Sequence, residues 1–413
     1  MPRRLITAHP QFHPDIFAAA GARKKDLAAF MGLVIIFFLL IFCALYAYFG
    51  YAVLLTAIGR GRPLREPPAD LAEDELPTVA LLIAAYNEEA IIARKIRNAL
   101  DLDYPAGKLS VVVVSDGSTD GTDSMVESYR DRGVTLLRVE GRQGKTVARN
   151  RAVANAEAEI VVMSDANGMY KPDALRKLAR HFADEKVGAV CGNLTLTGEG
   201  GRENLYWQYE KWIKRFEDRT HSIIGANGSI YAIRRSLYEE IPPEVDDDFI
   251  EPLLAYRKGY ALRYEDEAVS VEEDIAEHNV AAEFQAKKRV VLRGIQSLSY
   301  VSGLLNPFRY PMLSLELISH KIFKWLVPFC LIAIFVVNFF LPRHPFFVFT
   351  FIIQLAFYCS AFIGITSGCR ELYVPAFLVL TNAAILMAVC EFFVGRRNRT
   401  WDRTRGGATE DDS

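Results

Sequence analysis

Several segments of this 413-residue chain have the residue types and spacing that chemistry requires. The first is VVVVSDGSTDGT, residues 111–122, in which a β-branched run ends at Asp116. Gly117 can adopt a positive φ, so the chain can turn sharply and leave the Asp116 carboxylate facing a crevice. A helix cap would explain Ser118 and Asp120 but not Asp116. We therefore expect Asp116 to contact a ligand.

A second segment, SDANGMY at residues 164–170, places Asp165 and Asn167 at the end of another apolar run. Carboxylate and amide oxygens suit hard divalent cations, and magnesium typically uses one or two carboxylates together with substrate phosphates. The sequence Asp-Ala-Asn-Gly is also typical of an ordinary turn. The segment indicates a metal site only in combination with others.

Two further segments carry charge at expected helix starts. GRQGKTVARN, residues 141–150, places Lys145 after a glycine-bearing loop, where free N–H groups and the helix dipole favour an anion. It lacks the G-x-x-x-x-G-K-[ST] spacing, which argues against a nucleoside triphosphatase, and the absence of G-x-G-x-x-G argues against a dinucleotide oxidoreductase. Asp246, Asp247 and Asp248 precede an apolar segment and, taken alone, are more typical of a solvated helix start.

The surrounding pattern predicts an α/β fold of the Rossmann type. Expected strands at residues 78–86, 108–116, 134–140 and 159–166 alternate with expected helices at 87–103, 121–133 and 144–157. This alternation indicates a mostly parallel sheet with helices on both faces, and the run Val111–Val114 suits a central strand. Open sheets of this kind bind ligands beyond the carboxyl ends of their strands, so Tyr86, Glu88, Asp116 and Asp165 should converge.

Apolar residues concentrate near both ends of the chain. Residues 27–58, 326–341, 346–365 and 373–394 are almost free of charge. A bilayer core about 30 Å thick needs roughly 20 apolar residues, so we expect four transmembrane helices. The first is too long and too far from Met1 for a cleaved signal peptide, which favours a retained anchor. The net charge of −2 gives no basis for a nucleic-acid partner, and the six cysteines show no metal or disulfide spacing.

These features divide the chain into seven expected parts. They are an N-terminal tail (1–26), a transmembrane anchor (27–58), a linker (59–76), a catalytic domain (77–295), an amphipathic interfacial segment (296–325), C-terminal transmembrane helices (326–394) and a basic, then acidic, tail (395–413). The linker is proline-rich and charged, and it shows no periodicity.

Together the motifs resemble the family 2 glycosyltransferases, which are inverting enzymes with the GT-A fold. The closest type is the membrane-embedded group that includes cellulose, chitin, hyaluronan and poly-N-acetylglucosamine synthases. The resemblance spans residues 79–289 and is carried, in order, by AAYNEE, SDGSTD, the Asp-Ala-Asn triplet, GANGSIYAIRR and the triple aspartate before KGY.

This resemblance implies a role for each matching residue. Tyr86, Glu88, Asp116 and Lys145 would bind the nucleotide, Asp165 and Asn167 a Mg²⁺ or Mn²⁺ ion, and Asn227, Gly228 and Arg289 the acceptor, with Asp248 as the catalytic base. Trp207 is a candidate for stacking on a sugar, although aromatics on a helix are more often core residues.

The implied mechanism is a single displacement. The metal and Lys145 would stabilise the departing nucleoside diphosphate, while Asp248 would take a proton from the attacking acceptor hydroxyl. An α-linked nucleotide sugar, expected to be a UDP-sugar, would give a β-linked product. The acceptor would be a surface polysaccharide or a glycolipid, and the synthase-like group suggests partner subunits for synthesis or export.

Two departures from the family pattern keep alternatives open. Asn167 replaces the second aspartate of the D-x-D motif, so a catalytically silent nucleotide-binding subunit is one alternative. Ala286 and Val290 stand in the Q-x-x-R-W motif of processive synthases, which favours transfer of a single sugar to a lipid. Because nucleotide sugars are cytosolic, we expect a multi-pass protein of the cell membrane with a cytosolic catalytic domain. Three spans would then place the basic segment 395–405 outside, against the positive-inside rule.

Overall fold

The computed structural model describes residues 14–396 except 64, 198–202, 274–279 and 342–343. The chain divides into two compact units. One comprises Met1–Tyr46 and Leu326–Val379, and the other comprises Ala47–Trp325 and Leu380–Ser413. Each unit is described by itself.

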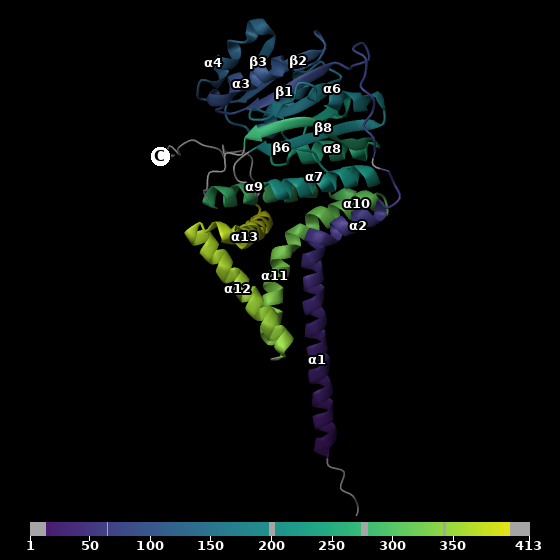
Figure 1. The fold of residues 1–413 in the computed structure, drawn as a ribbon, viewed down its shortest axis with the longest axis vertical. Helices are drawn as coiled ribbons and strands as arrows, with labels where there is room; N and C mark the ends of the chain where they lie inside the picture. Colours follow the sequence, from purple (N-terminus) through teal and green to yellow (C-terminus); the bar gives the residue numbers. More distant parts are fainter. Residues whose placement is uncertain (1–13, 64, 198–202, 274–279, 342–343, 397–413) are drawn as a thin grey trace, which may run out of the picture. The chain divides into compact units, whose positions relative to one another are not determined.

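The larger unit is built on one eight-stranded sheet (Figure 1). Its strands are β1 (Val79–Ala85), β2 (Leu109–Asp116), β3 (Val134–Val139), β4 (Ile160–Asp165), β5 (Met169–Tyr170), β6 (Val187–Thr197), β7 (Tyr231–Arg234) and β8 (Ala261–Glu273). The order is β3-β2-β1-β4-β7-β6-β8-β5. The first four strands are parallel, as the sequence predicts, but β7 runs antiparallel to β4 and β6, so the sheet is mixed.

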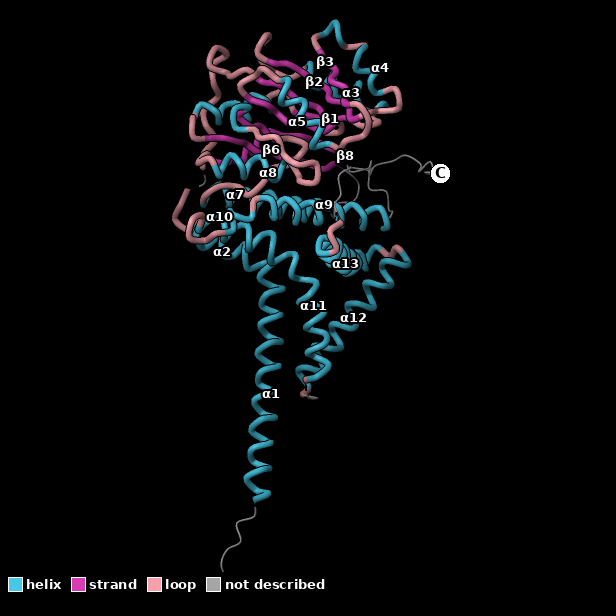
Figure 2. The backbone as a smooth tube through the Cα atoms, turned by 180° about the vertical axis from the view of Figure 1, so that it is seen from behind, coloured by secondary structure: helices cyan, strands magenta, loops and turns pink. Residues whose placement is uncertain are grey.

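Helices cover both faces of this sheet (Figure 2). The helices of the unit are α2 (Tyr51–Ile58), α3 (Glu89–Leu100), α4 (Thr122–Glu127), α5 (Lys145–Asn155), α6 (Ala174–Ala179), α7 (Glu203–Thr220), α8 (Asp247–Arg257), α9 (Val280–Tyr300) and α10 (Pro311–Leu317). Successive side chains of a strand point to opposite faces. Leu81 and Ile83 of β1 therefore join the core under α3, α4 and α6, whereas Leu82 and Ala84 join the core under α5.

A third apolar cluster joins α9 and α10 to α8 within the larger unit. Phe249 and Leu253 of α8 pack with Leu298 of α9 and with Leu313 and Leu317 of α10. Because α8 begins at the triple aspartate, this packing fixes the aspartates relative to α9.

Four helical stretches are long and apolar enough to cross a membrane: Ala28–Ile58, Pro311–Phe340, Pro345–Ser367 and Tyr373–Phe393. The smaller unit contains α1 (Pro14–Leu45), α12 (Pro345–Ser367) and most of α11 (Phe323–Phe340), and α13 (Tyr373–Phe393) begins in it. The number of expected spans is confirmed. The second starts earlier than expected, because a π-helical turn at Ile318–Ile322 joins α10 to α11 and draws in part of the expected interfacial segment. Most of the expected tail, residues 395–413, lies outside the described residues.

Candidate active site

The loops after β1 and β2 are bonded to each other at the carboxyl ends of the strands. Asn87 adopts a positive φ of 52° and its Oδ1 accepts a hydrogen bond from the Thr119 N–H at 2.8 Å. The Glu88 N–H donates to Thr122 Oγ1 at 2.8 Å. The first N–H groups of a helix have no partner within the helix, and the loop after β2 supplies one at the start of α3. Glu88 is thereby held at the site edge.

Asp116 lies beneath this edge. It is fully buried, its Oδ1 accepts from the Gln143 N–H at 2.9 Å and its Oδ2 from the Gly144 N–H at 2.8 Å. The carboxylate therefore points into the protein, whereas the sequence predicts that it faces the crevice. The reason is that two amides of a later loop supply ideal partners for a charge that burial would otherwise penalise. Its assignment to the nucleotide stays a prediction, and its structural effect is to shape the loop that leads into Lys145.

The same loop reaches Tyr86. The guanidinium of Arg142 lies 4.4 Å from the centre of the Tyr86 ring, a cation–π contact. Tyr86 is half-buried, so it lies at the surface where the sequence predicts a nucleotide base. Arg142 was not among the expected site residues.

Asp165 ends β4 and is paired with two cations of α5. Its Oδ1 lies 2.6 Å from Lys145 Nζ and 2.9 Å from Arg149 Nη2, and its side chain is 22% exposed. Within the described part of the chain, hydrogen bonds reach Oδ1 but not Oδ2 of this carboxylate. Asn167 donates from Nδ2 to Glu272 Oε2 at 3.2 Å. Asp165 Oδ2 and Asn167 Oδ1 are therefore two hard oxygen atoms that could hold a cation. Among the described residues, no group of three or more His, Cys, Asp or Glu side chains could hold a metal ion.

Arg149 joins this carboxylate to the triple aspartate. Its side chain is fully buried; Nη1 pairs with Asp247, and Nη2 also donates to the Gly228 carbonyl at 2.7 Å. Burial opposes the charge of Arg149, but Asp247 and Asp165 raise its pKa above the ordinary value. Burial likewise opposes ionisation of Asp247, but Arg149 and Lys145 lower the Asp247 pKa. Both groups are therefore charged, and α5, β4 and α8 are connected at one point.

Asp248 lies next to this ion-pair network at the start of α8. A Cβ atom built on Gly228 would lie 3.1 Å from Asp248 Oδ2 and 3.2 Å from Lys145 Nζ. Burial, followed by the charges of Asp246 and Asp247, raises the Asp248 pKa to about 7, although Lys145 and Arg149 act in the opposite direction. A carboxylate with a pKa near neutrality, beside an ammonium group, suits a general base.

Comparison with known proteins agrees with this geometry. Residues 80–242 match the model of the family described as Glycosyl transferase family 2. The chain contains a family 2 glycosyltransferase domain. Its fold is the GT-A fold, and a solved mannosyltransferase from Pyrobaculum calidifontis, in complex with GDP-Man and Mn²⁺, superposes with a TM-score of 0.66 at 21% identity over 87% of this chain and 99% of the other.

Three curated relatives cover parts of the chain. A probable glycosyltransferase, YdaM, of Bacillus subtilis is 28% identical over 48% of this chain and 51% of its own length. The poly-beta-1,6-N-acetyl-D-glucosamine synthase of Staphylococcus aureus is 24% identical over 48% and 50%. The beta-monoglucosyldiacylglycerol synthase of Nostoc is 34% identical over 29% and 26%. The chain thus spans between about a quarter and about half of the length of these relatives.

The expected acceptor residues differ in how close they lie to Asp248 and Lys145. Gly228 lies between Asp248 and Lys145, but Asn227 has a structural contact, because its Oδ1 accepts from Lys214 Nζ at 2.8 Å. Trp207 on α7 and Arg289 on α9 are half-buried, and their acceptor roles stay predictions.

Arg293, one helical turn after Arg289, reaches the site from α9. Its guanidinium pairs with Asp246, and Nη2 donates to Thr146 Oγ1 at 3.0 Å. Besides Arg142, sequence reasoning missed Arg149 and Arg293. The only signal in the sequence is spacing, because each lies four residues after a basic residue that was expected in the site.

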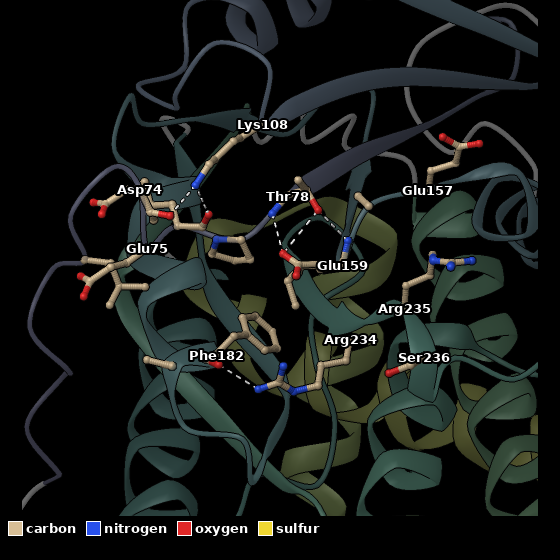
Figure 3. A pocket seen from close by; sticks show the side chains of 16 residues that line it. Asp74, Glu75, Thr78, Lys108, Glu157, Glu159, Phe182, Arg234, Arg235 and Ser236 are labelled. Atoms are coloured by element: carbon tan, nitrogen blue, oxygen red, sulfur yellow. Dashed lines mark hydrogen bonds between the residues drawn. The ribbon is translucent and has the colours of Figure 1, made fainter.

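The family 2 domain also contains a pocket at the amino ends of the strands. It has a volume of about 890 Å³ and is lined by residues that flank β1, β2, β4 and β7 (Figure 3). Lys108 Nζ donates to the Glu73, Asp74 and Leu76 carbonyls, and Glu159 accepts from the Thr78 N–H at 2.9 Å. None of the expected site residues lines this pocket.

Proposed function

We propose that this chain is an inverting glycosyltransferase. It transfers a sugar from a nucleoside-diphosphate sugar, expected to be a UDP-sugar, to a polysaccharide or glycolipid acceptor and forms a β-linkage. The observation that carries the proposal is that Asp248 and Lys145 flank Gly228 while Lys145 also pairs with Asp165. A base, a cation for phosphate and a carboxylate for a metal therefore share one small volume, as the single-displacement reaction requires.

The residues present fit a divalent cation, Mg²⁺ or Mn²⁺. Asp165 Oδ2 and Asn167 Oδ1 would hold it, since both are hard oxygen atoms that no described hydrogen bond engages. The bound ion supplies positive charge for the departing diphosphate. The mannosyltransferase of similar fold was solved with Mn²⁺, which supports this assignment.

Lys145 and Asp248 would carry out the remaining steps. The Lys145 ammonium lies at the amino end of α5, where it can move from Asp165 to a phosphate oxygen and neutralise charge on the leaving group. Asp248 would accept the proton of the acceptor hydroxyl. Its pKa of about 7 leaves a large fraction ionised at neutral pH and still makes it basic enough to take the proton.

Replacing Asp248 with Asn tests the base. The amide cannot accept the proton, so the rate of sugar transfer in membranes should fall by about 10²–10⁴-fold. Binding of UDP, measured by calorimetry, should change little, which separates loss of the base from loss of the nucleotide site. Undiminished transfer would remove the assignment, and tight nucleotide binding without turnover of any nucleotide sugar by the wild type would favour a silent subunit.

A second candidate function is the addition of one sugar to a lipid. Val290 stands where processive synthases have a tryptophan and is 63% exposed, so no aromatic ring supports a polymer end at this position. The match to beta-monoglucosyldiacylglycerol synthases favours the same reaction. Product sizing separates the candidates, because a ladder indicates polymerisation and a single species indicates one addition.

We place the chain in the cell membrane with the family 2 domain in the cytosol, where nucleotide sugars are made. A cysteine introduced at the exposed Glu127 should react with a membrane-impermeant maleimide only after cells are lysed. Labelling in intact cells, above that of the parent chain, would reverse this orientation.

A further inference from the structure

Glu272 approaches the Asp165–Asn167 turn from a distant part of the chain. It lies on β8, its side chain is 5% exposed, and its Oε2 accepts the hydrogen bond from Asn167 Nδ2 at 3.2 Å. Its Oε1 accepts from the Ser229 hydroxyl. A buried carboxylate therefore lies beside the one position at which the family's metal motif has lost a charge.

The chemistry of this contact fixes the orientation of the Asn167 amide. Glu272 Oε2 accepts a hydrogen bond from Asn167, and an amide has one donor end and one acceptor end. The end that faces Glu272 must therefore be the NH₂ group, and Oδ1 must lie on the other branch. The Asn167 oxygen therefore faces away from Glu272.

The backbone of the turn at residues 165–168 is held from two sides, which fixes the position from which the Asn167 side chain extends. Lys95 of α3 donates to the Gly168 carbonyl, and its ammonium lies 4.1 Å from the centre of the Tyr170 ring. A Cβ on Gly168 would lie 2.8 Å from Ser270 Oγ, which shows how closely the turn approaches β8. The Tyr170 hydroxyl donates to the Ser229 carbonyl at 2.9 Å, in the residue that also binds Glu272.

We propose that Glu272 is a positioning residue, which holds the Asn167 amide so that Oδ1 faces the divalent cation shared with Asp165. The inference rests on the proposed function and specifies how an amide can replace the missing aspartate. Glu272 would act on the cation only through its hydrogen bond to Asn167.

Binding of Mn²⁺ to the purified full-length chain, measured by electron paramagnetic resonance with saturating UDP and separately with GDP, tests this role. Glu272→Leu removes the acceptor and should raise the Mn²⁺ dissociation constant about tenfold or more. Glu272→Gln keeps a carbonyl oxygen for Asn167 Nδ2 and should stay within about threefold of the wild type. Glu265→Gln, on the same strand but paired with Arg180 and His181, is the matched control and should bind Mn²⁺ normally.

A double-mutant cycle separates positioning from a general structural effect. In an Asn167→Ala background, Glu272→Leu should cause no further loss of Mn²⁺ affinity, because the amide through which Glu272 acts is gone. Glu272→Ala goes through the same cycle, so a folding defect in one variant, detected by its melting temperature, leaves the other to decide.

Three results would overturn the role of Glu272. The first is normal Mn²⁺ binding by Glu272→Leu, and the second is an additive loss of Mn²⁺ affinity in the double mutant. The third is a loss in Glu272→Gln as large as that in Glu272→Leu, which would indicate that Glu272 binds the cation directly through its charge. A wild-type chain that binds Mn²⁺ with neither nucleotide would instead refute the metal in the proposed function, and the role of Glu272 with it.

Discussion

The two ends of the same strands use charged side chains in different ways. At the carboxyl ends, ion pairs join side chains that are far apart in sequence, and Arg149 contacts both Asp165 and Asp247. At the amino ends, charged side chains bind the main chain. Lys108 donates to three carbonyls. Arg234 donates to the Phe182 carbonyl, as Figure 3 shows, and also to the Val187 and Asp184 carbonyls.

The pocket and the proposed active site therefore lie at opposite ends of the strands. The pocket of about 890 Å³ is at the amino ends, yet the charges of Lys108 and Arg234 there are engaged in holding loops. A reaction needs charges that can change partner when a substrate arrives, and such charges face one another at the carboxyl ends. The mutual pairing of acids and bases is therefore the better indicator of the active site.

Removing one cation from each end gives the largest expected contrast. Arg149→Met leaves the Asp247 carboxylate buried without its guanidinium, so stability should fall by about 3–5 kcal/mol. Transfer should also fall, by about a hundredfold or more, because Gly228 and Asp165 lose a common anchor. Arg234→Met removes hydrogen bonds to carbonyls and a cation–π contact with the Phe182 ring, and we expect a loss of about 1–3 kcal/mol with normal transfer per folded molecule.

Melting temperatures and transfer rates of the full-length variants measure both effects. Normal transfer in Arg149→Met, or a matching loss of transfer in Arg234→Met, would contradict the contrast between the two ends.

Two glycines at opposite ends of β2 give a smaller contrast. Gly117 follows the strand with φ +69°, and a Cβ there would lie 2.6 Å from the carbonyl carbon of Gly141. Gly107 precedes the strand with φ +82° and has open space around it. Gly107→Ala should therefore cost about 1–2 kcal/mol from backbone strain alone. Gly117→Ala should cost more and also displace the loop whose amides bind Asp116.

Calorimetric titration with UDP distinguishes the two variants. Weaker nucleotide binding is expected for Gly117→Ala, and unchanged binding for Gly107→Ala. Equal stability losses and equal affinities would show that the contact between the loops at Gly117 and Gly141 has no effect on the site.

The sequence predicts the first half of the sheet well, because apolar runs there end at glycine and aspartate turns. The rule that ligands bind at carboxyl ends then brings Asp165 and Lys145 together, as the structure shows. The antiparallel direction of β7 could not be predicted in the same way. The strand has only four residues and is not part of the strand–helix alternation that indicates parallel neighbours.

The partners of individual charges were the harder part. The direction of the Asp116 carboxylate depends on two amide donors, Gln143 and Gly144, in a later loop that local turn chemistry does not reveal, and its nucleotide role stays a prediction. No motif marks Arg149 in the sequence, and only the fold shows that its face of α5 is turned toward Asp247. Glu272 lies in a charged strand whose proximity to Asn167 depends on the pairing of β8 with β5.

The smallest expected difference between the two ends is in the pH dependence of transfer, measured for one variant at each end. Asp248 acts as a base only when ionised, so with a pKa of about 7 the rate should fall about tenfold per pH unit on the acid side. Asp246→Asn removes a negative neighbour that raises the Asp248 pKa, so the ionised form of Asp248 becomes more favourable. The acid limb of kcat/KM should therefore move to lower pH, by up to about one unit, while rates above pH 8 change little. Glu159→Gln, at the amino-end pocket, should leave the limb in place. A limb that stays fixed in Asp246→Asn, or moves to higher pH, would show that another group limits the rate.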